Sequence, residues 1–292
     1  MDAKKIKKYY CWISVFIAVL FLLPPQSQAV GILRAMPAKV RLSIAPGSAK
    51  TGTISVENPT DSVKYVKAYL EDWFYLPEAD GSKDFKPAGT TELSCAKWIS
   101  FVPAEFSLPP FGKQAINYSV KVPEGANGGH YAILFLENTA PQMEEGGVGL
   151  GLAIRMGCLF YIEPEGTIKR TAEFNNLKLE KKHQEPLTIN LDFTNTGNVD
   201  LTVGGSFNII DKKGLVLARG EFNDVYTFPA GAAVLTSGWK ETIPKGKYDL
   251  VLTFNLGKAL EEVNMGRGPI IVKEAEIEIG NNGQITSVGQ MR

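Results

Sequence analysis

The sequence predicts an all-β protein of two β-sandwich domains that follow a cleaved signal peptide. After residue 29, short β-branched and aromatic runs are separated by Gly, Pro, Asn and Asp at regular intervals, which is typical of antiparallel sandwiches. A hydrophobic content of 44% is enough for two cores and excludes wholesale disorder. A basic N-terminus before a short apolar run indicates the signal peptide.

The first 29 residues have the three parts of a secretory signal peptide. Four lysines lie within the first eight residues, an apolar run covers residues 12–23, and Ser27-Gln28-Ala29 offers small residues to the peptidase. The run of about 12 residues is shorter than the roughly 20 that a membrane-spanning helix needs. We therefore expect residues 1–29 to be removed, so that the mature chain begins at Val30 and is periplasmic or extracellular. An uncleaved N-terminal anchor is the alternative.

Charge and hydropathy limit the partners of the mature chain. The signal carries four of the 31 basic residues and one of the 31 acidic residues, so 27 and 30 remain and the net charge is about −3. A slightly acidic chain does not favour a nucleic-acid partner. No second long apolar run follows, so we expect no transmembrane anchor after signal cleavage.

About seven strands are expected before residue 165, which is the number in one immunoglobulin-like sandwich. Their expected ranges are 40–45, 51–57, 63–75, 96–102, 114–122, 131–137 and 149–162. Pro164-Glu165-Gly166 then provides a hinge. We therefore assign residues 30–166 to a first immunoglobulin-like domain.

A second series of strands predicts a second immunoglobulin-like sandwich over residues 167–280. The expected ranges are 171–179, 187–194, 206–210, 215–220, 232–238, 248–255 and 269–279. Asp211-Lys212-Lys213-Gly214 separates two apolar runs and predicts a hairpin. Only residues 258–263 have a helical pattern, and the polar residues 281–292 are expected to form a disordered tail.

The segment 149–162 alternates sharply between two faces. One face carries Leu150, Leu152 and Ile154, and the other begins with Gly149 and Gly151. A period of two predicts a strand, and glycine in a strand marks a bulge, a bend or the close approach of another backbone. The alternative is a strand crowded by its own domain. The preceding polar stretch, 138–148, is either a recognition loop or a solvated connection.

Two cysteines, Cys95 and Cys158, remain after the signal. Two cysteines in an exported chain predict a disulfide between them. The alternative is a pair of buried free thiols that pack as small hydrophobic residues. Cys158 lies within the apolar alternation, where burial would raise its pKa and leave it unreactive.

The sequence contains no recognisable catalytic pattern, so we expect a non-catalytic protein without a cofactor or a metal. His130 and His183 stand apart from any metal-ligand spacing, and neither a nucleophile elbow nor a phosphate-binding loop occurs. Glu71 and Asp72 are adjacent in a predicted strand, so their carboxylates would point to opposite faces and could not easily flank one substrate.

Residues 37–166 resemble the N-terminal domain of periplasmic pilus chaperones. Residues 48–58 end in an apolar-x-Asn pattern and resemble the second strand of that domain, while Leu159-Phe160-Tyr161 resembles the end of its last strand. The resemblance implies an immunoglobulin-like binding protein that lends an apolar edge strand to a pilus subunit. It assigns this role to Leu150, Leu152 and Ile154.

Pilus chaperones also hold the terminal carboxylate of their subunit with an Arg and a Lys. The resemblance places these two anchors at Leu42 and Cys158, so both look absent. Arg41 lies one residue from the first position, and a slip of one residue moves a side chain to the other face of a strand.

A second resemblance favours a different function. Residues 96–99, 106–109, 120–123 and 129–132 resemble the peptidoglycan-binding domain of surface proteins that accompany WxL-type cell-wall proteins. The second half resembles generic bacterial immunoglobulin-like modules, which carry little functional information. We expect an exported pilus-chaperone-like assembly factor whose partner is a surface or pilus-type protein subunit of the cell envelope. A structural module that binds peptidoglycan or another surface protein is the alternative.

Overall fold

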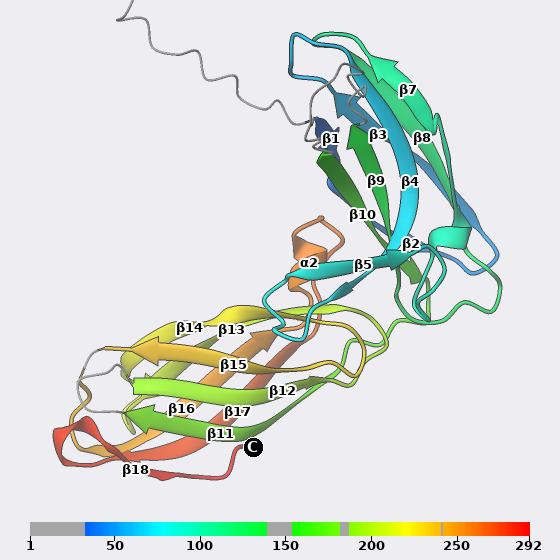
Figure 1. The fold of residues 1–292 in the computed structure, drawn as a ribbon. Coiled ribbons are helices and arrows are strands. Elements are labelled where there is room, and N and C mark those ends of the chain that lie inside the picture. Colours follow the sequence, from blue (N-terminus) through cyan, green and yellow to red (C-terminus); the bar gives the residue numbers. More distant parts are fainter. Residues whose placement is uncertain (1–32, 139–153, 182–186, 241) are drawn as a thin grey trace, which may run out of the picture. The chain divides into compact units, whose positions relative to one another are not determined.

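The computed structural model describes residues 33–138, 154–181, 187–240 and 242–292. Within these residues the chain is almost entirely β-structure, arranged in four sheets (Figure 1). The predicted all-β class with two immunoglobulin-like sandwiches is confirmed. Residues 1–29 and Val30 lie outside the described residues, so the signal peptide stays a prediction. No helix in the described part of the chain is long and apolar enough to cross a membrane.

Two sheets form the first sandwich. One has the order β1-β3-β8-β6 and consists of β1 Arg34–Met36, β3 Ala49–Glu57, β8 Lys113–Lys121 and β6 Ile99–Val102. The other has the order β2-β10-β9-β4-β5, with β7 also paired to β4. Its strands are β2 Lys39–Ile44, β10 Ile154–Pro164, β9 His130–Asn138, β4 Lys64–Tyr75, β5 Lys83–Pro87 and β7 Glu105–Leu108.

The burial of β9 explains its continuous apolar sequence. All six residues from Tyr131 to Leu136 are buried. Ala132, Leu134 and Leu136 face the core between the two sheets, whereas Tyr131, Ile133 and Phe135 pack in a second cluster on the outer face of their sheet. A strand that is covered on both faces carries an unbroken hydrophobic run rather than an alternation.

The first sandwich differs from the prediction in several elements, because β1, β5 and β7 lie outside the expected strand ranges. Residues 96–102, expected as one strand, begin with the 3-10 turn η1 Ala96–Trp98, and only then does β6 start. The Cys95 carbonyl accepts a local hydrogen bond from the Trp98 N–H at 2.9 Å. Residues 96–98 therefore form a turn instead of pairing with a neighbouring strand.

The second sandwich is built from the remaining two sheets. The smaller sheet consists of β11 Ala172–Lys181, β12 Leu187–Asn195 and β15 Ala232–Trp239. The larger one consists of β14 Val216–Thr227, β13 Leu201–Ile210, β16 Gly246–Asn255, β17 Ile270–Ile279 and β18 Ile285–Val288. The predicted hairpin turn at Asp211–Gly214 joins β13 to β14, and α2 Lys258–Glu261 lies within the predicted helical segment.

The C-terminal residues are ordered, contrary to the predicted tail. Residues 281–292 contain the 3-10 turn η2 Asn281–Gly283 and the strand β18, which pairs with β17. Arg292 and Glu274 also exchange backbone hydrogen bonds at 3.0 and 3.1 Å. Ile285 and Val288 pack against the hydrophobic core of the second sandwich. The polar composition of the segment gave no indication of these apolar contacts. The boundaries 30–166 and 167–280 remain a proposal, compatible with the change of sheets between Pro164 and Ala172.

Candidate functional site

One edge of β10 is only half covered. β10 pairs antiparallel with β9 from Ile154 to Ile162, but β2 pairs with its other edge only from Leu159 to Pro164. Among the described residues, no strand pairs with that second edge between Ile154 and Cys158. Unpaired N–H and C=O groups along a strand are a template for another extended chain.

The open edge arises because the incoming chain changes sheets. β1 pairs with β3 of the opposite sheet, and the chain runs beside β10 only after Met36. The first bond across the covered part joins the Leu159 N–H to the Ala38 carbonyl at 3.0 Å. Because backbone N–H directions alternate along a strand, the N–H groups of Arg155 and Gly157 point to the same side, which is the open one.

The apolar face of β10 becomes more exposed towards its open end. Cys158 is fully buried in the first core, Met156 is partly buried against that core, and Ile154 is half-buried. Ile154 is the member of the predicted edge-strand set that the structure describes. Leu150 and Leu152 lie outside the described residues.

The opposite face of β10 carries Arg155 and Gly157. The Arg155 guanidinium lies 4.2 Å from the centre of the Phe135 ring, and its Nη1 is 3.3 Å from Glu71 Oε1. A Cβ on Gly157 would lie 2.3 Å from Ile133 Cδ1. At Gly157 the strand is therefore crowded by its own domain, as the alternative interpretation of the glycines predicted.

In the structure Cys95 and Cys158 are both free and buried, which matches the alternative of two buried thiols and not the disulfide. They belong to the core of the first sandwich, where thiols pack as small hydrophobic residues. Burial raises the pKa of the Cys158 thiol to about 12, so it stays protonated and donates to the Pro37 carbonyl at 2.9 Å. Burial likewise raises the pKa of Cys95 well above its ordinary value.

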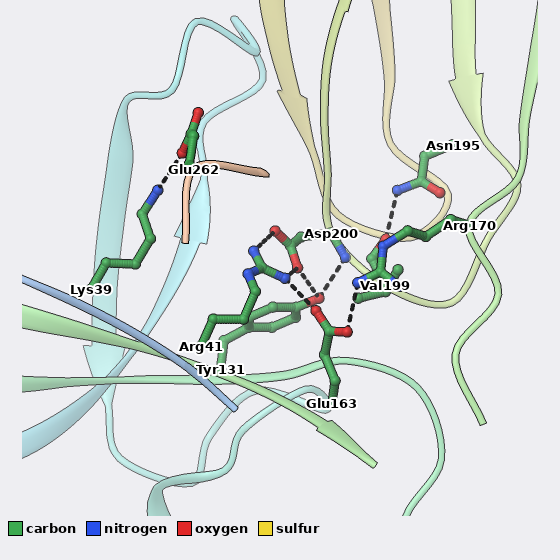
Figure 2. A network of polar contacts seen from close by, with 9 residues as sticks. All are labelled: Lys39, Arg41, Tyr131, Glu163, Arg170, Asn195, Val199, Asp200 and Glu262. Atoms are coloured by element: carbon green, nitrogen blue, oxygen red, sulfur yellow. Dashed lines mark hydrogen bonds and ion pairs between the residues drawn. The ribbon is translucent and has the colours of Figure 1, made fainter. Parts of the chain in front are cut away.

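A buried ion network centred on Arg41 joins β2 and β10 to the start of β13 (Figure 2). Arg41 Nη1 and Nη2 donate to Asp200 Oδ1 and Oδ2 at 3.0 and 2.6 Å, and Nη1 also donates to Glu163. Arg170 Nη2 donates to the second Glu163 oxygen at 2.6 Å. Two cations thus face two carboxylates, so the network is balanced within the chain.

Two further groups fix the position of Asp200. The Tyr131 hydroxyl donates to Asp200 Oδ1 at 3.2 Å and accepts the Asp200 N–H at 2.6 Å (Figure 2). Burial raises the pKa of Tyr131, so its hydroxyl stays protonated and can donate. The buried Asn195 donates to the Val199 carbonyl at 2.9 Å and shapes the turn that leads into Asp200.

The same network settles the charge state of Arg41. Burial alone lowers the pKa of its guanidinium, but the Asp200 and Glu163 carboxylates raise it by more, so the pKa lies above its ordinary value. Arg41 is therefore held within the fold as a cation. Its neighbour Leu42 packs against the first core. Leu42 and Cys158, the two anchor positions of the resemblance, are thus apolar contacts of the sandwich.

The histidines and the Glu71-Asp72 pair were the other polar candidates, and those that the structure describes contact residues of the fold. His130 contacts Trp98, with ring centres 4.2 Å apart. His183 lies outside the described residues. Asp72 is fully buried and accepts bonds from the loop at residues 89–94, whereas Glu71 faces Arg155. The described residues contain no His, Cys, Asp and Glu cluster suited to a metal ion.

Sequence reasoning did not find the ion network. A signal existed in the sequence, because Arg41 stands between Val40 and Leu42 in a strand and Asp200 stands between Val199 and Leu201. A charged residue within an apolar strand is buried only with a partner. The identity of the partner could not be read from the sequence, because Arg41 and Asp200 are 159 positions apart.

Comparisons with known proteins found similarity to solved structures, at low sequence identity. No family model and no curated protein matches the chain. Solved structures with a similar fold include the class 5 fimbriae chaperone CfaA, with 14% identity, a TM-score of 0.47, and coverage of 82% of this chain and 98% of that one. The chaperone SafB, solved with the SafA pilin of Salmonella enterica, has 14% identity, a TM-score of 0.41, and coverage of 84% and 97%.

Proposed function

We propose that the chain is an exported, non-catalytic binding protein that offers the open edge of β10 to an extended segment of a protein partner in the cell envelope. The observation that carries the proposal is the half-covered edge, with β2 paired only from Leu159 onward and no strand of the described residues beside Ile154–Cys158. Strand addition derives affinity from backbone hydrogen bonds and specificity from alternate side chains.

The side chains beside the open edge suit an apolar partner segment. Ile154 is half-buried, and the alternation continues in the sequence to Leu152 and Leu150. We propose that these three residues contact apolar positions of the partner. The Arg41 guanidinium is already paired with Asp200 and Glu163, so backbone pairing rather than a charged anchor would supply the affinity.

Two substitutions at one position test the edge directly. Arg155→Pro removes an N–H that faces the open side, and proline is tolerated on an edge when its missing N–H would face solvent. Arg155→Ala loses the same side-chain contacts but keeps the N–H. We expect both variants to melt within a few degrees of each other, and only Arg155→Pro to lose the partner that co-purifies from a periplasmic extract, identified by mass spectrometry.

The control separates strand pairing from damage to the domain. The Met156 N–H faces β9, so Met156→Pro breaks the internal ladder and should lower the melting temperature. Equal partner recovery with Arg155→Pro and Arg155→Ala at the same melting temperature would exclude the open edge as the binding site. Binding of purified peptidoglycan sacculi by both Arg155 variants, without a protein partner, would support the peptidoglycan alternative instead.

A further inference from the structure

An exposed phenylalanine occupies a strained turn in the first sandwich. The turn Pro109–Gly112 is closed by a hydrogen bond from the Gly112 N–H to the Pro109 carbonyl at 3.0 Å. Phe111, its third residue, has a φ of +56° and is 70% exposed. With proline in the second position this is a turn whose third residue is usually Gly or Asn, and any other residue is strained there. The exposed ring gains little packing within the chain to compensate.

A buried asparagine makes this turn rigid. Asn58 is 1% exposed, and its Nδ2 donates to the Pro109 carbonyl at 2.9 Å and to the Ser62 carbonyl at 2.8 Å. The Phe111 N–H donates to the Thr60 carbonyl at 3.0 Å. The loop after β3 and the turn before β8 therefore form one unit. It presents Val63, Pro110 and Phe111 to solvent, and we call these three residues the apolar tip.

The apolar tip lies at the end of the sandwich where the open edge begins. Val66 is opposite Asn138, and Asn138 is opposite Ile154, so these residues form one row across β4, β9 and β10. Lys64, next to Val63, is opposite Leu108, next to the Pro109 turn. The tip therefore lies at the same end of the sheet as Ile154 but across it from β10, with β9 and β4 between them, so a folded partner would have to span these strands to contact both.

The exposed area of the apolar tip and the charge around it indicate what kind of molecule would bind there. Three apolar residues expose much less than the roughly 800 Å² that each partner buries in a stable complex, so the tip alone could not hold a second copy of the chain. Lys113 beside it is already paired with Glu57 at 2.5 Å, and Lys64 next to Val63 is offset by Asp61 in the same loop, so the tip has little net positive charge for an anionic bilayer. A rigid aromatic side chain is instead typical of an anchor in the pocket of a folded protein.

We propose that Phe111 inserts into an apolar pocket of the same protein partner whose extended segment pairs with β10. This inference rests on the proposed function and adds a second, side-chain-specific contact to it. The tip would supply an anchor that is ordered before binding, so that the strain at Phe111 is retained because the exposed ring is needed by the partner.

Photo-crosslinking in cells that produce the full chain tests this inference. The photoreactive residue p-benzoylphenylalanine is placed at position 111 in one variant and at position 154 in another. We expect both positions to give an adduct with the same protein, identified by mass spectrometry. Phe111→Ser should lower the yield at position 154 by about tenfold, which is typical of an anchor residue. Leu215→Ser, at a 61% exposed residue of the second sandwich, is the matched control and should leave the yield unchanged.

The outcomes separate the inference from the proposed function. An adduct at position 154 without one at position 111, or an adduct of position 111 with lipid or with a second copy, would overturn the inference alone. The absence of a protein adduct at position 154 would overturn the proposed function and the inference together. Phe111→Gly should raise the melting temperature, because glycine accepts the positive φ, while lowering the yield at position 154. A lowered melting temperature would show that the ring stabilises its own domain and would also overturn the inference.

Discussion

Arg41 and Asp200 form a bidentate ion pair whose side chains are 1% and 0% exposed. Their two hydrogen bonds, at 3.0 and 2.6 Å, join β2 of the first sandwich to the start of β13 in the second. Removing either partner would leave a charge in surroundings that water does not reach, which costs far more than breaking a surface pair.

The first prediction is that Arg41→Met strongly destabilises the protein. Asp200 would lose its cation and Glu163 would keep only Arg170, so we expect a loss of about 3–5 kcal/mol in the free energy of unfolding. Urea denaturation measures it. Lys113→Met is the matched control, because its pair with Glu57 is 67% and 35% exposed and should contribute less than about 1 kcal/mol. Equal midpoints for the two variants would show that the buried network does not stabilise the fold.

The second prediction concerns pH and His130. Burial lowers the pKa of His130 in the folded chain, so the unfolded chain binds this proton at a higher pH than the folded chain does. The free energy of unfolding should therefore fall as the pH drops below the unfolded value of about 6.5. His130→Gln should weaken this dependence between pH 7.5 and 5. An unchanged slope in His130→Gln would contradict the assignment.

Much of the fold could be predicted because local sequence patterns determine most of its strands and turns. The period-two runs gave most strands, and the Asp211–Gly214 turn and the short helix at Lys258 followed from local residue choice. The prediction failed where contacts with residues distant in the sequence determine the local structure. Residues 281–292 have a polar composition, but a few apolar side chains order them against β17 and the second core.

The candidate site was predictable only in part for the same reason. The alternation through Ile154 predicted a strand, and only the family resemblance implied that this strand is an edge. Pairing determines which part of that strand is open, because β2 covers β10 only from Leu159. The φ of +56° at Phe111 follows from Asn58 and Thr60 holding the turn, and a Pro-Pro-Phe-Gly sequence does not specify those contacts.

The third prediction concerns the thiols. Cys95 and Cys158 are free and buried, so both should react with a thiol reagent in denaturant without a reductant, and neither should react in the native protein. Mass spectrometry counts the added labels. Two labels in denaturant are expected. If labels appear only after reduction, the cysteines are bridged in the exported protein.

The fourth prediction concerns export. The apolar run of residues 12–23 is too short to cross a bilayer, and small residues follow it at positions 27–29. Sequencing of the protein from a periplasmic extract should find Val30 at the N-terminus. Ala29→Asp places a charge at the cleavage position and should leave the unprocessed chain in the membrane fraction. Recovery of the wild-type chain with Met1 intact would contradict the signal assignment.

The last prediction concerns Asp72, which organises the loop between β5 and η1. Its carboxylate accepts five hydrogen bonds, from the N–H groups of Gly89, Thr90 and Thr91 and from the hydroxyls of Thr91 and Ser94. Burial by itself raises the pKa of Asp72, but these bonds lower it by more, so the carboxylate is the stable form in the folded chain. Its contribution to stability is present above the unfolded pKa of about 3.9 and is lost as the pH falls through the lower folded value.

Asp72→Ala removes all five acceptor contacts and leaves buried donors without partners, so we expect a loss of about 2–4 kcal/mol in the free energy of unfolding at pH 7. Asp72→Asn keeps one acceptor oxygen and should lose less. Asp84→Ala is the matched control, because Asp84 is an exposed residue of β5, and its effect should stay within about 0.5 kcal/mol. If Asp72→Ala and Asp84→Ala unfold at the same urea concentration, the loop is held by its own turns, and the buried carboxylate has no organising role.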